Sequence, residues 1–98
     1  MEFILQSSCF FSEQLEDLSK EALGVVEDKL RLIKLNPFRY KRIKGYNLFL
    51  FRIRFEDNRK ENRIIYLVDV PYVKLLCILD RGKEYKDLKR MLRKLGYK

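Results

Sequence analysis

The sequence predicts an α+β domain with an N-terminal strand, a helical hairpin, a three-stranded antiparallel meander completing one sheet, and a C-terminal helix. Between residues 12 and 36, apolar side chains recur every three or four positions, which is the period of an amphipathic helix. Between residues 46 and 79, apolar side chains alternate with polar ones or run continuously between turn residues, which is typical of strands. A length of 98 residues favours one domain spanning residues 1–98.

The first half of the chain is predicted to supply the first strand and the helical hairpin. A short apolar run at residues 3–5 is consistent with a strand, and Ser12 is the expected N-cap of the helix that follows. Ser19 is a second candidate cap, so the region is either one long helix or two helices. The helix should end at Asn36, because the residue before Pro37 avoids helical dihedral angles.

The second half is predicted to supply the meander. Residues 38–44 form a basic link, and two strands at 46–55 and 63–70 follow, joined by a seven-residue polar link at 56–62. The third strand, at 73–79, is continuously apolar and is expected to lie centrally in the sheet.

A helix over residues 83–95 should close the fold. Leu88, Met91, Leu92 and Leu95 form its narrow apolar stripe, and Gly96 is a suitable C-cap.

Alternation along the first meander strand gives it one apolar and one partly basic face. One face carries the apolar set Phe49, Phe51, Ile53 and Phe55, which should enter the core. The opposite face carries Arg52 and Arg54, and Arg63 joins them if the two strands pair as a hairpin. Three guanidinium groups on one face repel one another, so a phosphate backbone is one explanation of this face. A solvated face kept for solubility is the other.

The basic charge of the chain is confined to its second part. Residues 1–36 carry 4 Lys and Arg against 7 Asp and Glu, whereas residues 37–98 carry 18 against 7, which together give the net charge of +8. A one-sided basic surface is expected of a nucleic-acid binder. An acidic protein partner or an anionic membrane would also match it.

Composition narrows the chemistry further. The chain has no histidine, which excludes His-containing metal sites and His-based triads. Cys9 and Cys77 alone cannot form a four-thiolate site, so we expect no metal and no other cofactor. Cys77 should be a small buried hydrophobic residue. No apolar run approaches the roughly 18 residues of a membrane span, and the first residues do not resemble a signal peptide, so we expect a cytoplasmic protein without membrane contact.

An ordered set of short segments resembles the RelE/ParE toxin superfamily. The resemblance covers nearly the whole chain and is most specific in the second half. It rests on Leu35-Asn36-Pro37-Phe38, Ile43-Lys44-Gly45, Phe51-Arg52-Ile53-Arg54-Phe55, Asn62-Arg63-Ile64-Ile65-Tyr66 and Ile78-Leu79-Asp80-Arg81-Gly82-Lys83-Glu84-Tyr85.

The resemblance implies a function as well as a fold. The RelE branch comprises ribosome-dependent mRNA endonucleases, in which the RNA 2′-hydroxyl attacks the adjacent phosphate, and a small antitoxin neutralises the toxin. The resemblance therefore implies three partners, namely mRNA, the ribosome and a short acidic antitoxin. The family's catalytic positions fall on Arg52, Arg54, Arg63, Arg81 and Tyr85.

Further basic residues would hold RNA by sequence-independent phosphate contacts. They are Lys41, Arg42 and Lys44 in the basic link, and Lys86, Lys89 and Arg90 in the last helix.

Two alternatives stay open at this point. RelE members often carry lysine where this chain has Arg52 and Arg54, and arginine cannot act as a general base. The base would then be Tyr85, Glu56 or Asp57. The departure also admits a ParE-like toxin that binds a protein such as gyrase without cutting RNA, or a non-catalytic basic RNA-binding module. Tyr66 is expected to pack in the core and not to take part in catalysis.

Overall fold

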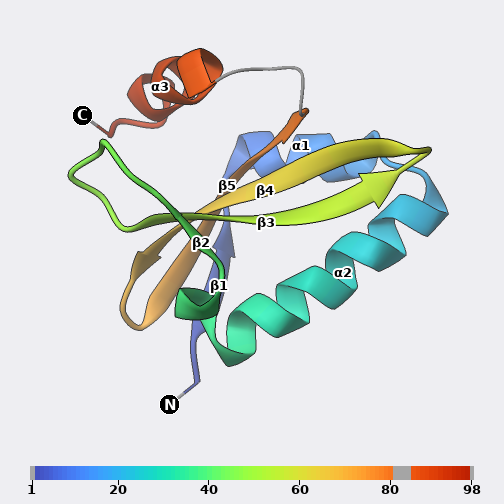
Figure 1. Cartoon of the computed structure of the whole chain (residues 1–98), viewed down its shortest axis with the longest axis horizontal. Helices are drawn as coiled ribbons and strands as arrows, with labels where there is room; N and C mark the ends of the chain where they lie inside the picture. The colour runs from blue at the N-terminus through green and yellow to red at the C-terminus, as the bar shows by residue number, and fades with distance from the viewer. Residues whose placement is uncertain (1, 81–84, 98) are drawn as a thin grey trace.

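The computed structural model describes residues 2–80 and 85–97, in which three helices cover the two faces of a five-stranded sheet (Figure 1). The strands are β1 (Ile4–Ser7), β2 (Lys41–Ile43), β3 (Leu50–Asp57), β4 (Lys60–Asp69) and β5 (Tyr72–Asp80). The helices are α1 (Cys9–Glu16), α2 (Lys20–Leu35) and α3 (Tyr85–Lys94), with a short 3-10 turn η1 (Pro37–Arg39). The predicted α+β class, with its helical hairpin, antiparallel meander and final helix, is confirmed. No helix in this part of the chain combines the length and apolar character needed to cross a membrane.

The strand order is β1-β5-β4-β3-β2, and only the β1–β5 pair is parallel. This order corrects two expectations. β4 is the central strand, whereas the apolar β5 lies between β4 and β1. The basic link expected at residues 38–44 contains β2, which pairs with β3 through three residues and makes the sheet one strand wider than predicted. Three residues are too short to show an alternation pattern, so only pairing with β3 reveals this strand.

The helical hairpin begins earlier than Ser12. Ser8 is the N-cap of α1: its Oγ accepts a hydrogen bond from the Phe11 N–H at 3.0 Å and donates one to the Leu76 carbonyl at 2.8 Å. Ser12 is therefore inside the helix, because β1 ends at Ser7 and the sheet already orients the next residue as a cap. Ser19 caps α2 as predicted, accepting from the Ala22 N–H at 3.1 Å.

The β3–β4 hairpin turns within two residues, so the predicted seven-residue link is wrong. Asn58 and Arg59 have φ values of 50° and 65°, the left-handed region that tight hairpin turns require. The polar residues around them belong to the strands, with Glu56 opposite Glu61 and Asp57 opposite Lys60. This end of the ribbon extends into solvent, where strands tolerate polar side chains on both faces.

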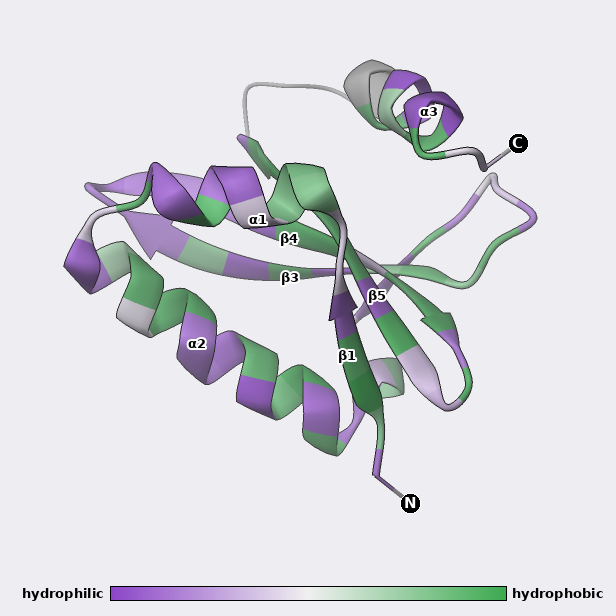
Figure 2. Ribbon diagram, turned by 180° about the vertical axis from the view of Figure 1, so that it is seen from behind, coloured by the Kyte–Doolittle hydropathy of each residue, from purple (hydrophilic) through white to green (hydrophobic). Residues whose placement is uncertain are grey.

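Two apolar clusters lie on the two faces of the sheet. In the first cluster, Phe51, Ile53 and Phe55 of β3 pack against Phe11 of α1. They also pack against the inner face of α2, which includes Val26 and Ile33. Figure 2 shows hydrophobic and hydrophilic residues alternating along α2, as expected of a helix with one face on the sheet. Phe49 was predicted to join this cluster, but its side chain is 56% exposed because it lies before β3 begins.

The second cluster lies under α3. Leu88 and Leu92 pack on Leu50, Ile65, Leu67, Leu79 and the residues Leu76 and Cys77, which confirms the predicted apolar stripe of the last helix. A bulge between Ile65 and Tyr66 shifts the β4–β5 register, so that the adjacent Leu76 and Cys77 both enter this cluster. Burial raises the pKa of the Cys77 thiol to about 12, as expected of a buried hydrophobic residue.

A side chain of α1 completes the edge of β5 beyond the short β1. Gln14 Nε2 donates a hydrogen bond to the Ile78 carbonyl at 2.8 Å, and Gln14 Oε1 accepts one from the Ile78 N–H at 2.7 Å. The amide thus takes the place of a strand residue at a position where β1 has already ended. Both backbone groups of Ile78 are satisfied and α1 is held against the sheet.

Candidate nucleic-acid interface

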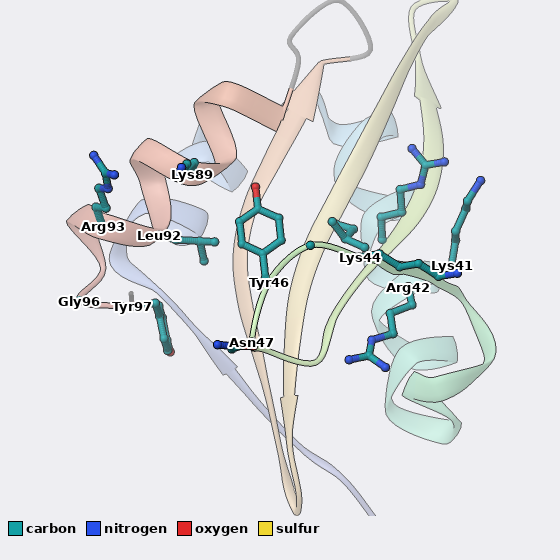
Figure 3. Close-up of a pocket in the computed structure, with 13 residues that line it drawn as sticks. Lys41, Arg42, Lys44, Tyr46, Asn47, Lys89, Leu92, Arg93, Gly96 and Tyr97 are labelled. Carbon is teal, nitrogen blue, oxygen red and sulfur yellow. The ribbon is translucent and has the colours of Figure 1, made fainter.

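A cleft of about 1270 Å³ lies between the loop that connects β2 to β3 and the C-terminal half of α3 (Figure 3). In Figure 1 the same loop reaches toward the chain end that follows α3. The sheet contributes Arg52, and the helix contributes Lys89, Leu92 and Arg93. The cleft is therefore built from three segments that are distant in sequence.

The lining of this cleft is strongly basic. Six Lys or Arg side chains contribute to it, and none of the described lining residues is acidic. They are Lys41, Arg42, Lys44, Arg52, Lys89 and Arg93. Such a concentration of one charge favours an anionic ligand that follows the groove, as a phosphate backbone does.

Strand pairing explains why basic residues from different strands meet here. Lys41 of β2 lies directly opposite Arg52 of β3, so both side chains share the face of the sheet that carries α3. Arg52 is only 9% exposed. Arg42 pairs instead with Phe51 of the α2-side cluster, so strand alternation directs its side chain to the other face. There its guanidinium lies 4.7 Å from the centre of the Phe49 ring, a cation–π contact.

The arginine face continues along the sheet from the cleft toward the β3–β4 turn. Arg54 lies directly opposite Arg63, which confirms the predicted grouping of these residues with Arg52 on one face. Arg54 forms an ion pair with Glu61 at 3.2 Å, and its side chain is 58% exposed. Arg63 Nε is buried and has no hydrogen-bond partner among the described residues. Within the part of the chain that is described, this nitrogen is an unsatisfied donor within the arginine face, which is unusual for a buried polar group.

The two remaining catalytic candidates lie at the start of α3 and in the segment before it. Arg81 lies outside the described residues, and Tyr85 begins α3 without a described side chain. Asn62 pairs with Asp80, so β5 ends beside the position that precedes Arg63.

The basic residues expected on α3 do not share one surface. Lys89 lines the cleft, whereas Arg90 lines a smaller pocket of about 430 Å³ on another side of the helix, together with Asp17 and Asp80. The side chain of Lys86 lies outside the described set.

Several residues that line the cleft were not named as site residues from the sequence, among them Arg93, Tyr46, Asn47 and Tyr97. Arg93 lies four residues after Lys89 and therefore on the same helix face, a spacing that could have indicated it. Tyr46 and Tyr97 had no signal of their own, since aromatic residues near turns are common. Only the approach of α3 to the β2–β3 loop brings them to one cleft.

Other candidate chemistry is absent or inert among the described residues. They contain no group of three or more His, Cys, Asp or Glu side chains that could hold a metal ion. Tyr66 is fully buried, and its hydroxyl donates a 2.7 Å hydrogen bond to the Pro37 carbonyl. Burial, with a smaller effect from Tyr40, raises the pKa of Tyr66 far above its ordinary value. The prediction that Tyr66 packs in the core is confirmed.

Comparisons with known proteins bear on the fold. No family model matches the sequence, and no curated protein matches it. Among solved structures, one of the free E. coli toxin RelE, with two arginines replaced by alanine, superposes with a TM-score of 0.77. The alignment covers 97% of this chain and 99% of that one at 12% sequence identity. This chain has the RelE fold. The fold that the sequence resemblance implied is thus confirmed, and the basic cleft and arginine face are features of this chain on a RelE scaffold.

Proposed function

We propose that this chain is a RelE-like toxin that binds mRNA on the ribosome and cleaves it by attack of a 2′-hydroxyl on the adjacent phosphate. The observation that carries the proposal is the arginine face beside the basic cleft. Arg54 and Arg63 lie opposite one another, Arg63 Nε is buried without a partner among the described residues, and Arg52 extends the same face into the cleft. The RelE fold supports the assignment.

The charge of these residues suits the proposed reaction. The 2′-hydroxyl loses its proton to a base and forms a bond to phosphorus, and the bond from phosphorus to the 5′-oxygen of the next nucleotide breaks, which leaves a 2′,3′-cyclic phosphate and a 5′-hydroxyl end. The pentavalent phosphate between these two events gains negative charge, and fixed cations stabilise developing charge without reorganising. Arg63 supplies such a cation from β4, where strand pairing on both sides holds its backbone. The family resemblance adds Arg81 as a second cation and Tyr85 as a group that orients or deprotonates the 2′-hydroxyl.

The cleft provides the binding surface in this proposal. Lys41, Lys44 and Lys89 would contact phosphates of mRNA or ribosomal RNA without reading sequence. Arginine stays protonated, so the general base is not Arg52 or Arg54.

Cleavage on translating ribosomes tests the proposal. Wild-type protein added to a cell-free translation reaction should produce new 5′ ends in the message, located by primer extension. Arg63→Ala should reduce cleavage at least about 100-fold, the usual cost of losing one group that stabilises transition-state charge. Arg31→Ala is the matched control, because Arg31 lies on α2 in an exposed pair with Asp28 and should leave cleavage unchanged. Undiminished cleavage by a variant that combines Arg63→Ala with Arg81→Ala would refute the mechanism.

A short acidic antitoxin is the partner that this function requires. The net charge of +8 supports an acidic binding segment, as does the absence of acidic side chains among the described residues that line the cleft. A small acidic protein encoded beside this chain should bind it and suppress the cleavage described above. A neighbouring protein that binds without lowering cleavage would contradict this part of the proposal.

A ParE-like inhibitor is the second candidate function. It is favoured by one feature, namely that arginine occupies both basic positions of β3, where proton transfer is not possible. Inhibition of gyrase supercoiling by wild-type protein, with intact message in the ribosome assay, would favour this candidate over the nuclease.

A further inference from the structure

Tyr46 and Tyr97 occupy a position in the cleft that the arginine chemistry does not explain. Both side chains are half-buried, pack against the apolar cluster beneath α3, and also line the cleft. In the view of Figure 3, Leu92 lies between them at the base of the cleft. Each ring is thus supported by the core on one side and borders the basic cleft on the other.

Backbone turns at two glycines set where each tyrosine leaves the chain. Gly96 has a φ of +89°, and the helix ends in a Schellman arrangement in which Tyr97 N–H donates to the Leu92 carbonyl at 2.8 Å and Gly96 N–H to the Arg93 carbonyl at 3.1 Å. Tyr46 follows Gly45, whose φ is +96°. A tyrosine side chain has only two torsion angles, so it loses little conformational entropy when it binds a flat ligand.

Charged and polar side chains surround this pair of rings. Lys44, Lys89 and Arg93 line the same cleft and can hold phosphates, while Asn47 offers amide donors and an acceptor suited to the edge of a base. Aromatic rings among cations are the usual means of binding unpaired nucleotides, whose bases are free to stack.

The geometry points to a base-stacking subsite in which at least one unpaired nucleobase of single-stranded RNA stacks on Tyr46 or Tyr97 over Leu92. This inference rests on the proposed RNA function and adds to it a binding site for an unpaired base. Arg52 lines the same cleft, and Arg54 follows two residues further along β3, roughly 7 Å away at the usual strand spacing. The stacked base therefore belongs to a nucleotide near the phosphate held by the arginine face.

Binding of modified oligonucleotides tests the subsite without depending on catalysis. A fluorescein-labelled RNA octamer with 2′-O-methyl groups at every sugar cannot undergo the proposed attack, so anisotropy reports binding alone. The same octamer with abasic sugars keeps every phosphate and removes every base. Wild-type protein should bind the complete octamer about 5- to 150-fold more tightly than the abasic one, the range expected for stacking on one base.

Variants assign the effect to the two rings. Tyr46→Ala and Tyr97→Ala should lose part or all of the preference for the complete octamer, whereas Tyr46→Phe and Tyr97→Phe should keep it. Tyr72→Ala is the matched control, because Tyr72 begins β5 and does not line the cleft. The abasic comparison changes only the RNA, so the test stands even if an alanine variant fails to fold.

The outcomes separate the subsite from the wider proposal. Equal affinity of wild-type protein for complete and abasic octamers would overturn the subsite and leave the phosphate-binding cleft in place. A preference for complete RNA that survives both alanine substitutions would overturn the assignment to Tyr46 and Tyr97. Base-dependent binding combined with no cleavage on ribosomes would support the subsite while refuting the nuclease.

Discussion

The cleft should make RNA binding steeply dependent on salt. Six of the described residues that line it are Lys or Arg. Of these, Arg42 is already stacked on Phe49, and Arg52 has another contact within the chain. Four to six phosphate contacts are therefore expected. For a single strand, the logarithm of the association constant should fall with the logarithm of the salt concentration, with a slope of about −0.7 per contact.

The expected magnitude follows from that count. Four to six contacts give a slope of about −3 to −4, so raising the salt concentration from about 50 mM to about 200 mM should weaken binding roughly 50- to 300-fold. Lys89→Ala removes one contact and should make the slope shallower by about 0.7. Lys34→Ala provides the control, since Lys34 is exposed in the last turn of α2 and outside the cleft.

Anisotropy titrations of the 2′-O-methyl octamer over this salt range provide the measurement. Circular dichroism of each variant confirms that the fold is retained. A wild-type slope shallower than about −1.5, which corresponds to roughly two contacts, would refute the claim that the cleft follows a phosphate backbone. An equal change of slope in Lys34→Ala and Lys89→Ala would show that the attraction is spread over the surface and is not concentrated in the cleft.

Three further predictions concern the scaffold that positions the cleft. Gln14→Ala should lower the free energy of unfolding by about 2 kcal/mol in urea titrations, because two hydrogen bonds to Ile78 are lost. Glu13 is exposed on the same helix, so the control variant Glu13→Ala should change the free energy of unfolding by less than about 0.5 kcal/mol. Tyr66→Phe should cost about 1–3 kcal/mol in the same assay by leaving the buried Pro37 carbonyl without its donor, and a neutral result would mean that water replaces the hydroxyl. Burial raises the pKa of Cys77 from 9.0 to about 12, so a thiol reagent near neutral pH should label the exposed Cys9 of the native protein and leave Cys77 unlabelled. The free energy of unfolding should fall as pH rises from about 9 toward 12, since only the unfolded chain releases the Cys77 proton in that range. Cys77→Val should remove this part of the pH dependence.

Local patterns in the sequence were sufficient for much of the fold. The three-to-four-residue period and the cap at Ser19 defined α2, and Pro37 ended it, because helix propensity and capping act within a few residues. Alternation along β3 placed Arg52 and Arg54 on one face before any partner strand was known, since successive side chains of a strand must point to opposite sides. The position of Gly96 after α3 followed from the same kind of local rule.

Pairing and packing between distant segments decided the rest. Ser8, and not Ser12, is the N-cap of α1, and its hydroxyl donates a hydrogen bond to the Leu76 carbonyl of β5, 68 positions away in the sequence. No local pattern near Ser12 could reveal such a long-range contact. The short β2 exists only because β3 pairs with it, and that pairing brings Lys41 beside Arg52. The sequence by itself determined that this chain would carry arginines on one face of a sheet. Only the tertiary structure decided that a helix and a loop would enclose part of that face as a basic cleft bordered by two tyrosines, because long-range contacts, and not local propensity, set the distance between them.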